Sequence, residues 1–284
     1  MRNLFNDTVL IFIRLAASSK VIFENNEGLF KDVTQASGLS EEKGWWFGLE
    51  EGDFDSDGDP DYIAGNLGLN YKYKADKERP FKIHAGDLDG NGSHDIVLGY
   101  FNQGSLYPVR GLQCSSQQMP GLKQKFKSYE AFGTATLEDV YGALRLERAM
   151  VLDATNFASS YLENLGNGKF KLSPLPIQAQ FSSINDILVR DFDDDGFLDA
   201  IVVGNLHASE VETTRNDAGI GTFLKGNGTG NLKTVSYEET GLLLRNDVKQ
   251  LGMLQGKNGK IILAANNNGM LESYEINKES HTNH

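Results

Sequence analysis

The stretch that decides the fold is Asp53-Phe54-Asp55-Ser56-Asp57-Gly58-Asp59-Pro60-Asp61, a short acidic loop. Residues 87–95 and 191–199 repeat it, and all three copies follow the pattern D-x-D-x-[DN]-G-x-x-D. Carboxylates at alternate positions converge when the chain curls, and the glycine at the sixth position permits the sharp turn. Such a loop suits a hard cation that takes about six to eight oxygen ligands, above all Ca²⁺. The sequence therefore predicts about three calcium sites.

Each predicted site takes its ligands from the same positions of the loop. Side-chain oxygens come from the first, third, fifth and ninth positions, and a backbone carbonyl comes from the seventh. Without a cation, these clustered carboxylates would repel one another. We expect the second loop, which has one carboxylate fewer, to bind most weakly, and Asp194 to point to solvent. The predicted ligands are Asp53, Asp55, Asp57, the carbonyl of Asp59, and Asp61; Asp87, Asp89, Asn91, the carbonyl of Ser93, and Asp95; and Asp191, Asp193, Asp195, the carbonyl of Phe197, and Asp199.

The residues that follow each loop exclude an EF-hand. An EF-hand requires flanking helices and a glutamate at the twelfth position, where this chain has Ala64, Leu98 and Val202. Short apolar runs rich in β-branched residues follow the loops instead, which predicts buried strands. These runs are residues 62–66, 96–100 and 200–205. The loops are therefore expected to join strands.

A second repeated unit consists of an apolar strand, an Asn/Gly turn and a return strand. Residues 21–30 and 161–170 have this pattern, and residues 223–232 follow it more loosely. Asn and Gly supply the positive φ angles that a tight hairpin requires. One repeat is thus strand, acidic loop, strand and hairpin, which gives the four strands of one β-propeller blade. Residues 252–266 align with residues 52–66 without the acidic ligands, so we expect a structural blade there that holds no metal.

The sequence as a whole predicts an all-β protein, a β-propeller of about four or five four-stranded blades with a short helical insertion. Residues 1–284 would form a single propeller domain or a fragment of one. Its expected divisions are residues 1–100 (blades with the first two calcium loops), 101–160 (the insertion and a divergent blade), 161–278 (blades with the third loop and the degenerate copy) and 279–284 (a tail).

Other motifs are spread over most of the chain: Gly44-Trp45-Trp46, DYIAGNLGLN at residues 61–70, Pro108-Val109-Arg110-Gly111, SSQQMP at 115–120, LEDVY at 137–141, SSYLEN at 159–164 and Asp217-Ala218-Gly219. The loops and hairpins resemble FG-GAP/VCBS repeats, the repeats of integrin α-subunit propellers. With the motifs above, the chain more narrowly resembles bacterial, Bacteroidetes-type repeat proteins related to the cartilage acidic protein family. Members of that family are usually longer and are secreted or surface-attached. The resemblance therefore implies the C-terminal part of a longer polypeptide that is extracellular, at the cell surface or periplasmic.

The net charge of −12 argues against nucleic acid or an anionic membrane as a partner. About a third of the 39 acidic residues lie in the three loops, so the acidity has a local explanation. No segment is long and apolar enough to predict a membrane span. The single cysteine, Cys114, is expected to be an inert thiol.

Residues 8–13 form a short apolar run that loosely resembles the core of a signal peptide. Asp7 and Arg14 bracket this run, so we prefer to interpret it as the first strand of a truncated blade. We therefore expect an open arc of blades rather than a ring that residues 8–13 close against strands at 260–275.

Two groups of residues are candidates for ligand binding. Trp45 and Trp46, with Asn66, Asn70 and Tyr73, could stack on a sugar and hydrogen-bond to it, although packing is the more common role for a tryptophan at a blade edge. The other group lies in the insertion, where short helices are expected at residues 122–126 and, capped by Thr136, at 137–141. Its members could line a recognition site or simply pack within the insertion; they are Arg110, Gln117, Gln118 and Tyr129.

Catalysis finds little support in the sequence. The five histidines fall in no metal-ligand spacing, and no nucleophile elbow, zinc-protease motif or phosphate loop is present. We therefore expect a calcium-binding module that binds or adheres to a protein or a glycan. The alternatives are an extracellular polysaccharide-processing enzyme, with its site in the insertion, and a purely structural part of a larger surface protein.

Overall fold

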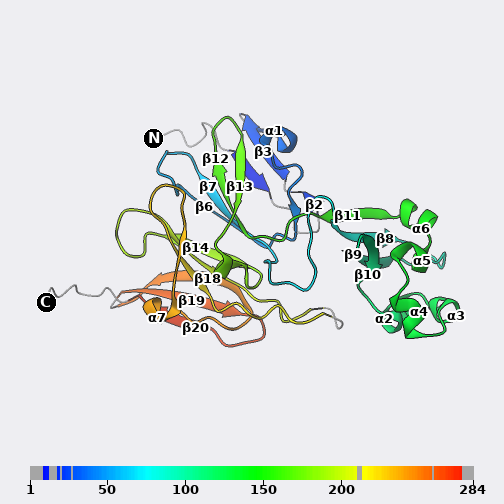
Figure 1. Ribbon diagram of the computed structural model, residues 1–284. Helices are drawn as coiled ribbons and strands as arrows, with labels where there is room; N and C mark the ends of the chain where they lie inside the picture. Colours follow the sequence, from blue (N-terminus) through cyan, green and yellow to red (C-terminus); the bar gives the residue numbers. More distant parts are fainter. Residues whose placement is uncertain are drawn as a thin grey trace.

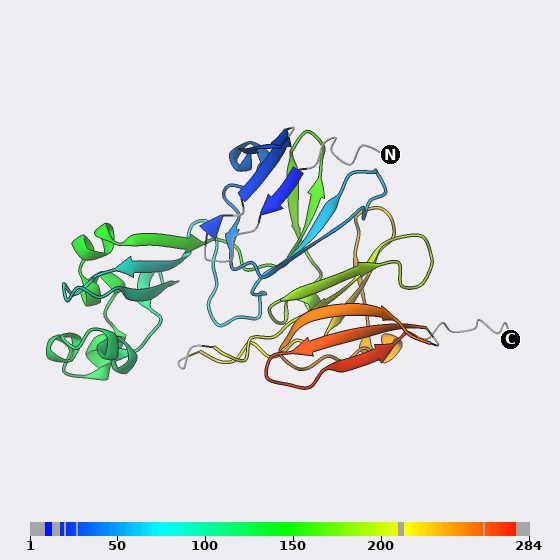
Figure 2. The same ribbon diagram turned by 180° about the vertical axis from the view of Figure 1, so that it is seen from behind.

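Antiparallel β-sheets account for most of the regular secondary structure of this protein, which is compatible with the predicted all-β chain (Figure 1). The structure is a computed structural model, and it describes residues 9–12, 18–19, 21–26, 28–209, 213–257 and 259–276. Four sheets follow one another in a stack, and a further sheet belongs to a smaller unit that projects to one side (Figures 1 and 2). Two short strands, β2 (Ser18–Ser19) and β5 (Lys43–Gly44), pair separately.

One sheet has the strand order that the sequence predicts for a complete repeat. Its strands lie side by side in chain order, with the third acidic loop between the first two and the hairpin expected at residues 223–232 between the last two. The strands are β14 (Asp186–Arg190), β15 (Asp199–Val203), β16 (Thr222–Lys225) and β17 (Lys233–Val235).

Strand β15 explains how the sheets stack. Successive side chains of a strand point to opposite faces of its sheet. Ala200 and Val202 pack with Ile63 of the preceding sheet, whereas Ile201 and Val203 pack against the last sheet. The uninterrupted apolar run at 200–203 is what a strand with two covered faces requires, and all of its residues are buried.

The sheet before it combines two distant segments of the chain. Its order is β13-β12-β7-β6, and the first acidic loop joins β6 to β7. The strands are β6 (Gly48–Gly52), β7 (Asp61–Gly65), β12 (Ser160–Asn164) and β13 (Phe170–Pro174). The hairpin predicted at residues 161–170 is confirmed as β12–β13. The chain therefore leaves this sheet after residue 65 and returns to it only at residue 160.

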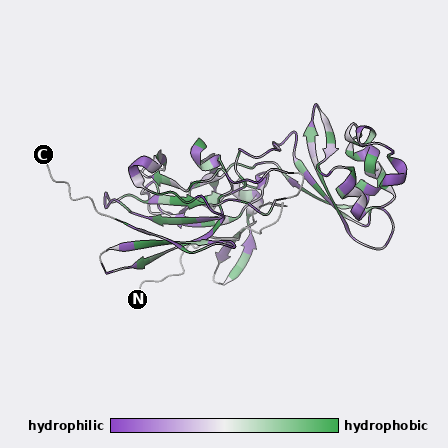
Figure 3. Ribbon diagram, turned by 90° about the horizontal axis from the view of Figure 1, so that it is seen from below, coloured by the Kyte–Doolittle hydropathy of each residue, from purple (hydrophilic) through white to green (hydrophobic). Residues whose placement is uncertain are grey.

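The intervening residues form an inserted unit with a sheet and helices of its own. Figure 3 shows it set apart from the stacked sheets, with its helices gathered at its far end. The sheet order is β10-β9-β8-β11, from β8 (Phe81–Gly86), β9 (Asp95–Asn102), β10 (Ser105–Pro108) and β11 (Met150–Ala154). The second acidic loop joins β8 to β9, so it belongs to the inserted unit. The expected divisions at residues 100 and 160 thus do not coincide with the sheets, because β11 completes a sheet that begins at residue 81.

The helices of the inserted unit cover one apolar core. They are α2 (Leu112–Gln118), α3 (Leu122–Lys125), α4 (Tyr129–Gly133), α5 (Leu137–Tyr141) and α6 (Ala143–Arg148). The two predicted helices are confirmed as α3 and α5. Thr136 caps α5 as predicted: its hydroxyl accepts a hydrogen bond from the Asp139 amide at 3.2 Å, and Asp139 Oδ2 accepts one from the Thr136 amide at 2.9 Å.

His84 of β8 is buried in this unit, and burial lowers its pKa because the charged imidazolium loses its hydration. The folded chain then binds fewer protons at this position than the unfolded chain, whose histidine titrates near 6.5. The free energy of unfolding must therefore fall as the pH drops below the pKa of His84 in the unfolded chain. It continues to fall until the pH has passed the lower pKa of His84 in the folded chain. We expect wild type to lose more stability than His84→Leu between about pH 7.5 and about pH 5.5. Urea unfolding at both pH values, followed by tryptophan fluorescence, measures the difference.

The matched control is His94→Leu, because His94 is exposed beside the same sheet. It should lose stability over this pH range as wild type does. An equal loss in wild type and His84→Leu would show that His84 does not contribute to the acid sensitivity.

The first sheet of the stack has the order β1-β3-β4, from β1 (Val9–Phe12), β3 (Val21–Asn26) and β4 (Leu29–Asp32). The hairpin predicted at residues 21–30 is confirmed as β3–β4. Buried Ile22 packs with Tyr62 and Leu162 of the next sheet. The remaining short helices are α1 (Thr34–Ser37), η1 (Ile177–Gln180) and α7 (Tyr237–Thr240).

The last sheet has the order β18-β19-β20, from β18 (Val248–Gln255), β19 (Lys260–Asn266) and β20 (Glu272–Glu275). The strand predicted for the degenerate copy is present, but the acidic loop is replaced by a shorter turn. Pairing continues to Gln255 and Lys260, so Gly252 pairs with Leu263, whereas Gly52 pairs with Asp61.

Strand β1 pairs with β3 and, within the described residues, not with the last sheet. Residues 1–8 and 13–17 and the expected tail at 279–284 lie outside the described residues. In the part of the chain that the structure describes, no helix is long and apolar enough to cross a membrane.

Candidate metal centre

The three acidic loops share one backbone conformation. Each joins the first two strands of a four-stranded sheet, as the sequence predicts. The glycine at the sixth position has the left-handed φ that the sharp turn requires: 94° at Gly58, 86° at Gly92 and 91° at Gly196. The residue at the fourth position also has a left-handed φ, which is 63° at Ser56, 83° at Gly90 and 59° at Asp194. The loop pattern does not predict this, because it specifies no residue type at that position.

Hydrogen bonds between backbone amides and acidic side chains hold this conformation. The amide of the sixth position donates to the carboxylate of the first, which fixes the first carboxylate under the turn. The distances are 3.2 Å for Gly58 to Asp53, 2.9 Å for Gly92 to Asp87 and 3.0 Å for Gly196 to Asp191. The amide of the seventh position likewise donates to the side chain of the fifth, at 2.8 Å for Asp59 to Asp57, 2.7 Å for Ser93 to Asn91 and 3.0 Å for Phe197 to Asp195.

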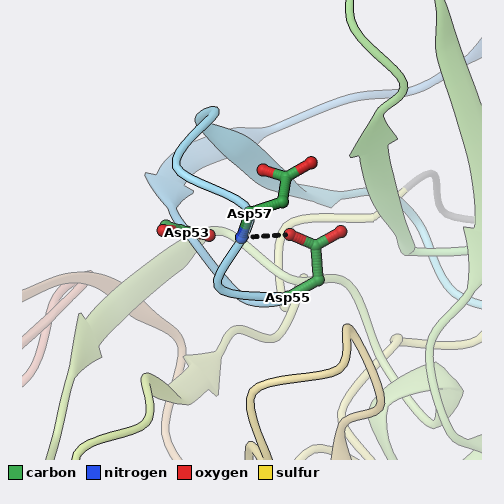
Figure 4. Close-up of side chains that lie close together, drawn as sticks. All are labelled: Asp53, Asp55 and Asp57. Carbon is green, nitrogen blue, oxygen red and sulfur yellow. Dashed lines mark hydrogen bonds between the residues drawn. The ribbon is translucent and has the colours of Figure 1, made fainter.

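Three carboxylates converge in each loop. Figure 4 shows Asp53, Asp55 and Asp57 gathered around the turn, with the Asp57 amide bonded to Asp55. Each group of three offers oxygen atoms that lie within 4.8 Å of one another, which is close enough to share a cation. The groups are Asp53, Asp55 and Asp57; Asp87, Asp89 and Asp95; and Asp191, Asp193 and Asp195.

The ninth-position aspartates anchor the loop and are fully buried. Asp61 Oδ2 accepts a hydrogen bond from the Phe54 amide at 3.3 Å, and its Oδ1 accepts one from Asn164 at 2.7 Å. Asp199 makes the equivalent bonds, at 3.1 Å from Phe192 and 2.9 Å from Gly226. Asp61 and Asp199 thus tie the loop to the neighbouring hairpin and lie outside the groups of three. Of the ninth-position residues, only Asp95 joins its group.

The other predicted ligands have simpler positions. Asn91 completes the hydrogen-bond pattern of the second loop, with its Oδ1 bonded to Ser93. The backbone carbonyls of Asp59, Ser93 and Phe197 remain ligands by prediction from the sequence. The side chains of these three residues are exposed. Asp194 is exposed, as expected for a residue that is not a ligand.

The electrostatics of the loops favour a cation. Burial, together with the charges of Asp57 and Asp53, raises the pKa of Asp55. Among the described residues, Asp53 Oδ1 is buried without a hydrogen-bond partner. Leaving a buried acceptor unsatisfied costs about 1–3 kcal/mol, and more for a charged group. A bound cation would satisfy this oxygen and offset the repulsion.

In the third loop a cationic side chain already lies against the carboxylates. Lys225 Nζ contacts Asp193, and it lies 3.1 Å from Asp195 Oδ2. These hydrogen bonds raise the pKa of Lys225. The contact shows that this group of oxygens accepts a positive charge.

Three of the candidate sugar-binding residues cannot contact a ligand in this structure, because they are buried. Trp46 is 1% exposed, Asn66 0% and Tyr73 4%. Trp45 is half-buried and packs edge-on against Phe81, with ring centroids 5.1 Å apart. Both tryptophans therefore have packing contacts in this structure. Asn70 alone is exposed, and it donates to the Phe181 carbonyl at 3.2 Å.

Asn66 has a structural role at the junction between the stack and the inserted unit. Its Oδ1 accepts hydrogen bonds from the amides of Trp45 at 3.0 Å and Leu67 at 2.8 Å. Its Nδ2 donates to the carbonyls of Asn156 at 2.9 Å and Ala158 at 3.3 Å. One side chain thus joins three segments of the chain.

The candidates in the insertion divide in a similar way. Gln118 Oε1 accepts a hydrogen bond from the Ile96 amide at 3.1 Å, and Nε2 donates to the Ile96 carbonyl at 3.3 Å. Arg110 also contacts the Ile96 carbonyl, at 3.5 Å. These two side chains complete the edge of β9 where β10 has ended. Gln117 and Tyr129 are exposed.

A cavity of about 360 Å³ lies on the stack beside β16 and α7. Phe181 and Tyr237, both partly exposed, line it together with polar groups that include Gln178, Glu239 and Thr240. No pattern in the sequence marks this cavity, because η1 and α7 are far apart in the chain and carry no recognisable motif.

No protein-family model matches this chain, and a search of curated proteins gives no match either. The interpretation of the loops therefore rests on their residues and their geometry.

Proposed function

We propose that this chain is a calcium-binding β-propeller module of the FG-GAP/VCBS type that acts outside the cell and binds a protein or a glycan. One observation carries the proposal: three loops far apart in the sequence repeat the same hydrogen bonds and gather three carboxylates each. Such a repeated arrangement is hard to explain without a common ligand, because it brings like charges together.

Calcium fits the donor set better than other common cations. The oxygens are carboxylates and, in the second loop, the side-chain amide of Asn91, and Ca²⁺ accepts such ligands in flexible geometry. Zn²⁺ prefers nitrogen and sulfur ligands, and Mg²⁺ demands near-ideal octahedral geometry. We propose affinities in the weak extracellular range, with dissociation constants on the order of 10⁻⁴–10⁻³ M.

The propeller assignment is supported by the way the sheets follow one another. Two four-stranded sheets share the same strand order and loop position, and each packs face to face with the next sheet in the chain. We propose that these sheets are blades, and that the inserted unit occupies the connection between the second and third strands of one blade. In the sheet β14–β17 this same connection comprises residues 204–221.

The extracellular setting and the ligand class are proposed from the resemblance to FG-GAP/VCBS repeats. The cavity beside α7 combines aromatic and polar groups, which suits a sugar. It replaces the residues around Trp45 and Trp46 as the surface that we propose for recognition. A glycan array screened with and without Ca²⁺ tests this part of the proposal.

Isothermal titration calorimetry tests the calcium sites directly. We expect about three Ca²⁺ ions per wild-type chain and one fewer in Asp191→Asn, because the substitution removes a converging charge but keeps an acceptor for the Gly196 amide. Asp194→Asn is the matched control, since it removes the same charge from an exposed position of the same loop. It should bind as many ions as wild type. No heat of binding in wild type, or equal binding by Asp191→Asn and wild type, would refute the proposal.

A further inference from the structure

The residue opposite the ninth position of the loop differs in charge between the first and third sites. In the sheet with the first loop, Leu162 of β12 pairs with Tyr62, so Glu163 lies opposite Asp61. In the sheet with the third loop, Leu224 of β16 pairs with Ala200, so Lys225 lies opposite Asp199. The following residues confirm the equivalence, because the amides of Asn164 and Gly226 donate to Asp61 and Asp199.

Lys225 makes direct use of this position. Its ammonium contacts the carboxylates of Asp193 and Asp195, both of which are among the proposed calcium ligands. An ammonium group is a compact charge with three donors, so it can occupy a place between two carboxylates. A calcium ion that uses both carboxylates must compete with it. The side chain is part-exposed, and the four-carbon stem of a lysine allows it to move aside.

Glu163 places the opposite charge beside the first loop. The strand register places it opposite Asp61, the last residue of that loop. Lys171 of β13 lies 2.7 Å from Glu163 Oε2 and neutralises part of this charge. The first loop therefore has additional negative charge nearby, and the third loop has a cation of its own.

We propose that this position on the third strand sets the calcium affinity of each loop: Lys225 competes with Ca²⁺ as an internal cation, and Glu163 strengthens binding. The inference rests on the proposed calcium function and deepens it. It gives the order of affinity for two loops that have identical ligand residues at the first, third, fifth and ninth positions. The first site should fill before the third. Without metal, the third loop should stay closed around Lys225.

Nuclear magnetic resonance separates the sites within one chain. The amides of Gly58 and Gly196 donate to the first carboxylate of their loops, so each amide signal reports the occupancy of its own site. A Ca²⁺ titration of the ¹⁵N-labelled protein then gives two half-saturation concentrations. We expect Lys225→Gln to lower the half-saturation concentration of Ca²⁺ at Gly196 by about fivefold and to leave that at Gly58 unchanged.

Two further variants separate this effect from a general change in charge. Lys233 of β17 is paired with Lys225, and Lys233→Gln removes its positive charge. This variant should leave the half-saturation concentration at Gly196 near that of wild type. Lys225→Arg keeps the charge, so its half-saturation concentration at Gly196 should lie closer to that of wild type than that of Lys225→Gln. In the sheet with the first acidic loop, Glu163→Gln should raise the half-saturation concentration at Gly58 by a few fold and leave that at Gly196 unchanged.

The outcomes distinguish this inference from the calcium proposal itself. If neither glycine signal responds to Ca²⁺ at millimolar concentration, the proposed function fails. If both respond but Lys225→Gln and Lys233→Gln shift Gly196 equally, or neither shifts it, the calcium sites stand and the role of Lys225 is refuted.

Discussion

Removal of Ca²⁺ by a chelator is expected to lower the melting temperature of this protein and to expose residues 53–61 and 191–199 to proteases. At about 10 mM Ca²⁺, roughly ten- to a hundredfold above the proposed dissociation constants, a metal that binds only the folded chain stabilises it by about 1.4–2.7 kcal/mol per site. For a chain of this size, each kcal/mol corresponds to roughly 2–4 °C. Several sites together should therefore give a shift that calorimetry detects easily. Cleavage should be greater in the first loop, because Lys225 still neutralises the third.

The control for this experiment is a chain with one substitution in each loop, Asp53→Asn, Asp87→Asn and Asp191→Asn. Each change removes a charge but keeps a side-chain oxygen for the glycine amide. Its melting temperature should not respond to Ca²⁺ or to chelator. Identical melting curves of wild type with chelator and with millimolar Ca²⁺ would show that the loops contribute nothing through metal binding.

The substitution Asn66→Ala is expected to destabilise the protein by about 3 kcal/mol, because it leaves four backbone groups without their partner, two of them in buried and two in part-buried hydrogen bonds. The side chain is fully buried, so water cannot replace it without opening the junction. The inserted unit is held there by Trp45, Phe81 and Phe157, whose rings lie in contact. Chemical denaturation at constant Ca²⁺ measures the loss.

Asn70→Ala is the matched control for Asn66→Ala. Asn70 is close in sequence and was an equal candidate for sugar binding, but it is exposed and makes one hydrogen bond, to Phe181. Its loss should cost less than about 1 kcal/mol. Equal effects of the two substitutions would contradict the structural role of Asn66.

The local elements of this fold could be predicted from the sequence because each depends on neighbouring residues. The acidic loops carry their glycine and their alternate carboxylates within nine residues, and the hairpins carry their Asn/Gly turns. Helix α5 has its capping residue next to it at Thr136. In these elements the residues that determine the backbone conformation are neighbours in the sequence, so a local sequence pattern predicts them.

The pairing of distant segments could not be predicted in this way. Strand β12 pairs with β7 across the whole inserted unit, and no local pattern in Ser160–Asn164 identifies that partner. The same limit explains why Trp46 and Asn66 were candidates for ligand binding. Their residue types suit a sugar, but the segments that bury them are distant in sequence: residues 156–158 bond to Asn66, and Trp46 packs with Leu162 and Phe170.

The charge opposite the ninth position is another feature that only the structure reveals. Glu163 and Lys225 lie far from their loops in sequence, and their equivalence depends on strand register. Loops with the same ligand residues can therefore differ in their electrostatic surroundings. The prediction that the second loop binds most weakly considers only the residues within each loop.

The most direct test of the calcium assignment is an anomalous-difference map from crystals grown with Ca²⁺. We expect a peak within each group of converging carboxylates, between Asp53, Asp55 and Asp57, between Asp87, Asp89 and Asp95, and between Asp191, Asp193 and Asp195. The coordinating oxygens should lie at about 2.3–2.6 Å from the metal. Loops without any anomalous density at millimolar Ca²⁺, with Lys225 still against Asp193 and Asp195, would contradict the account.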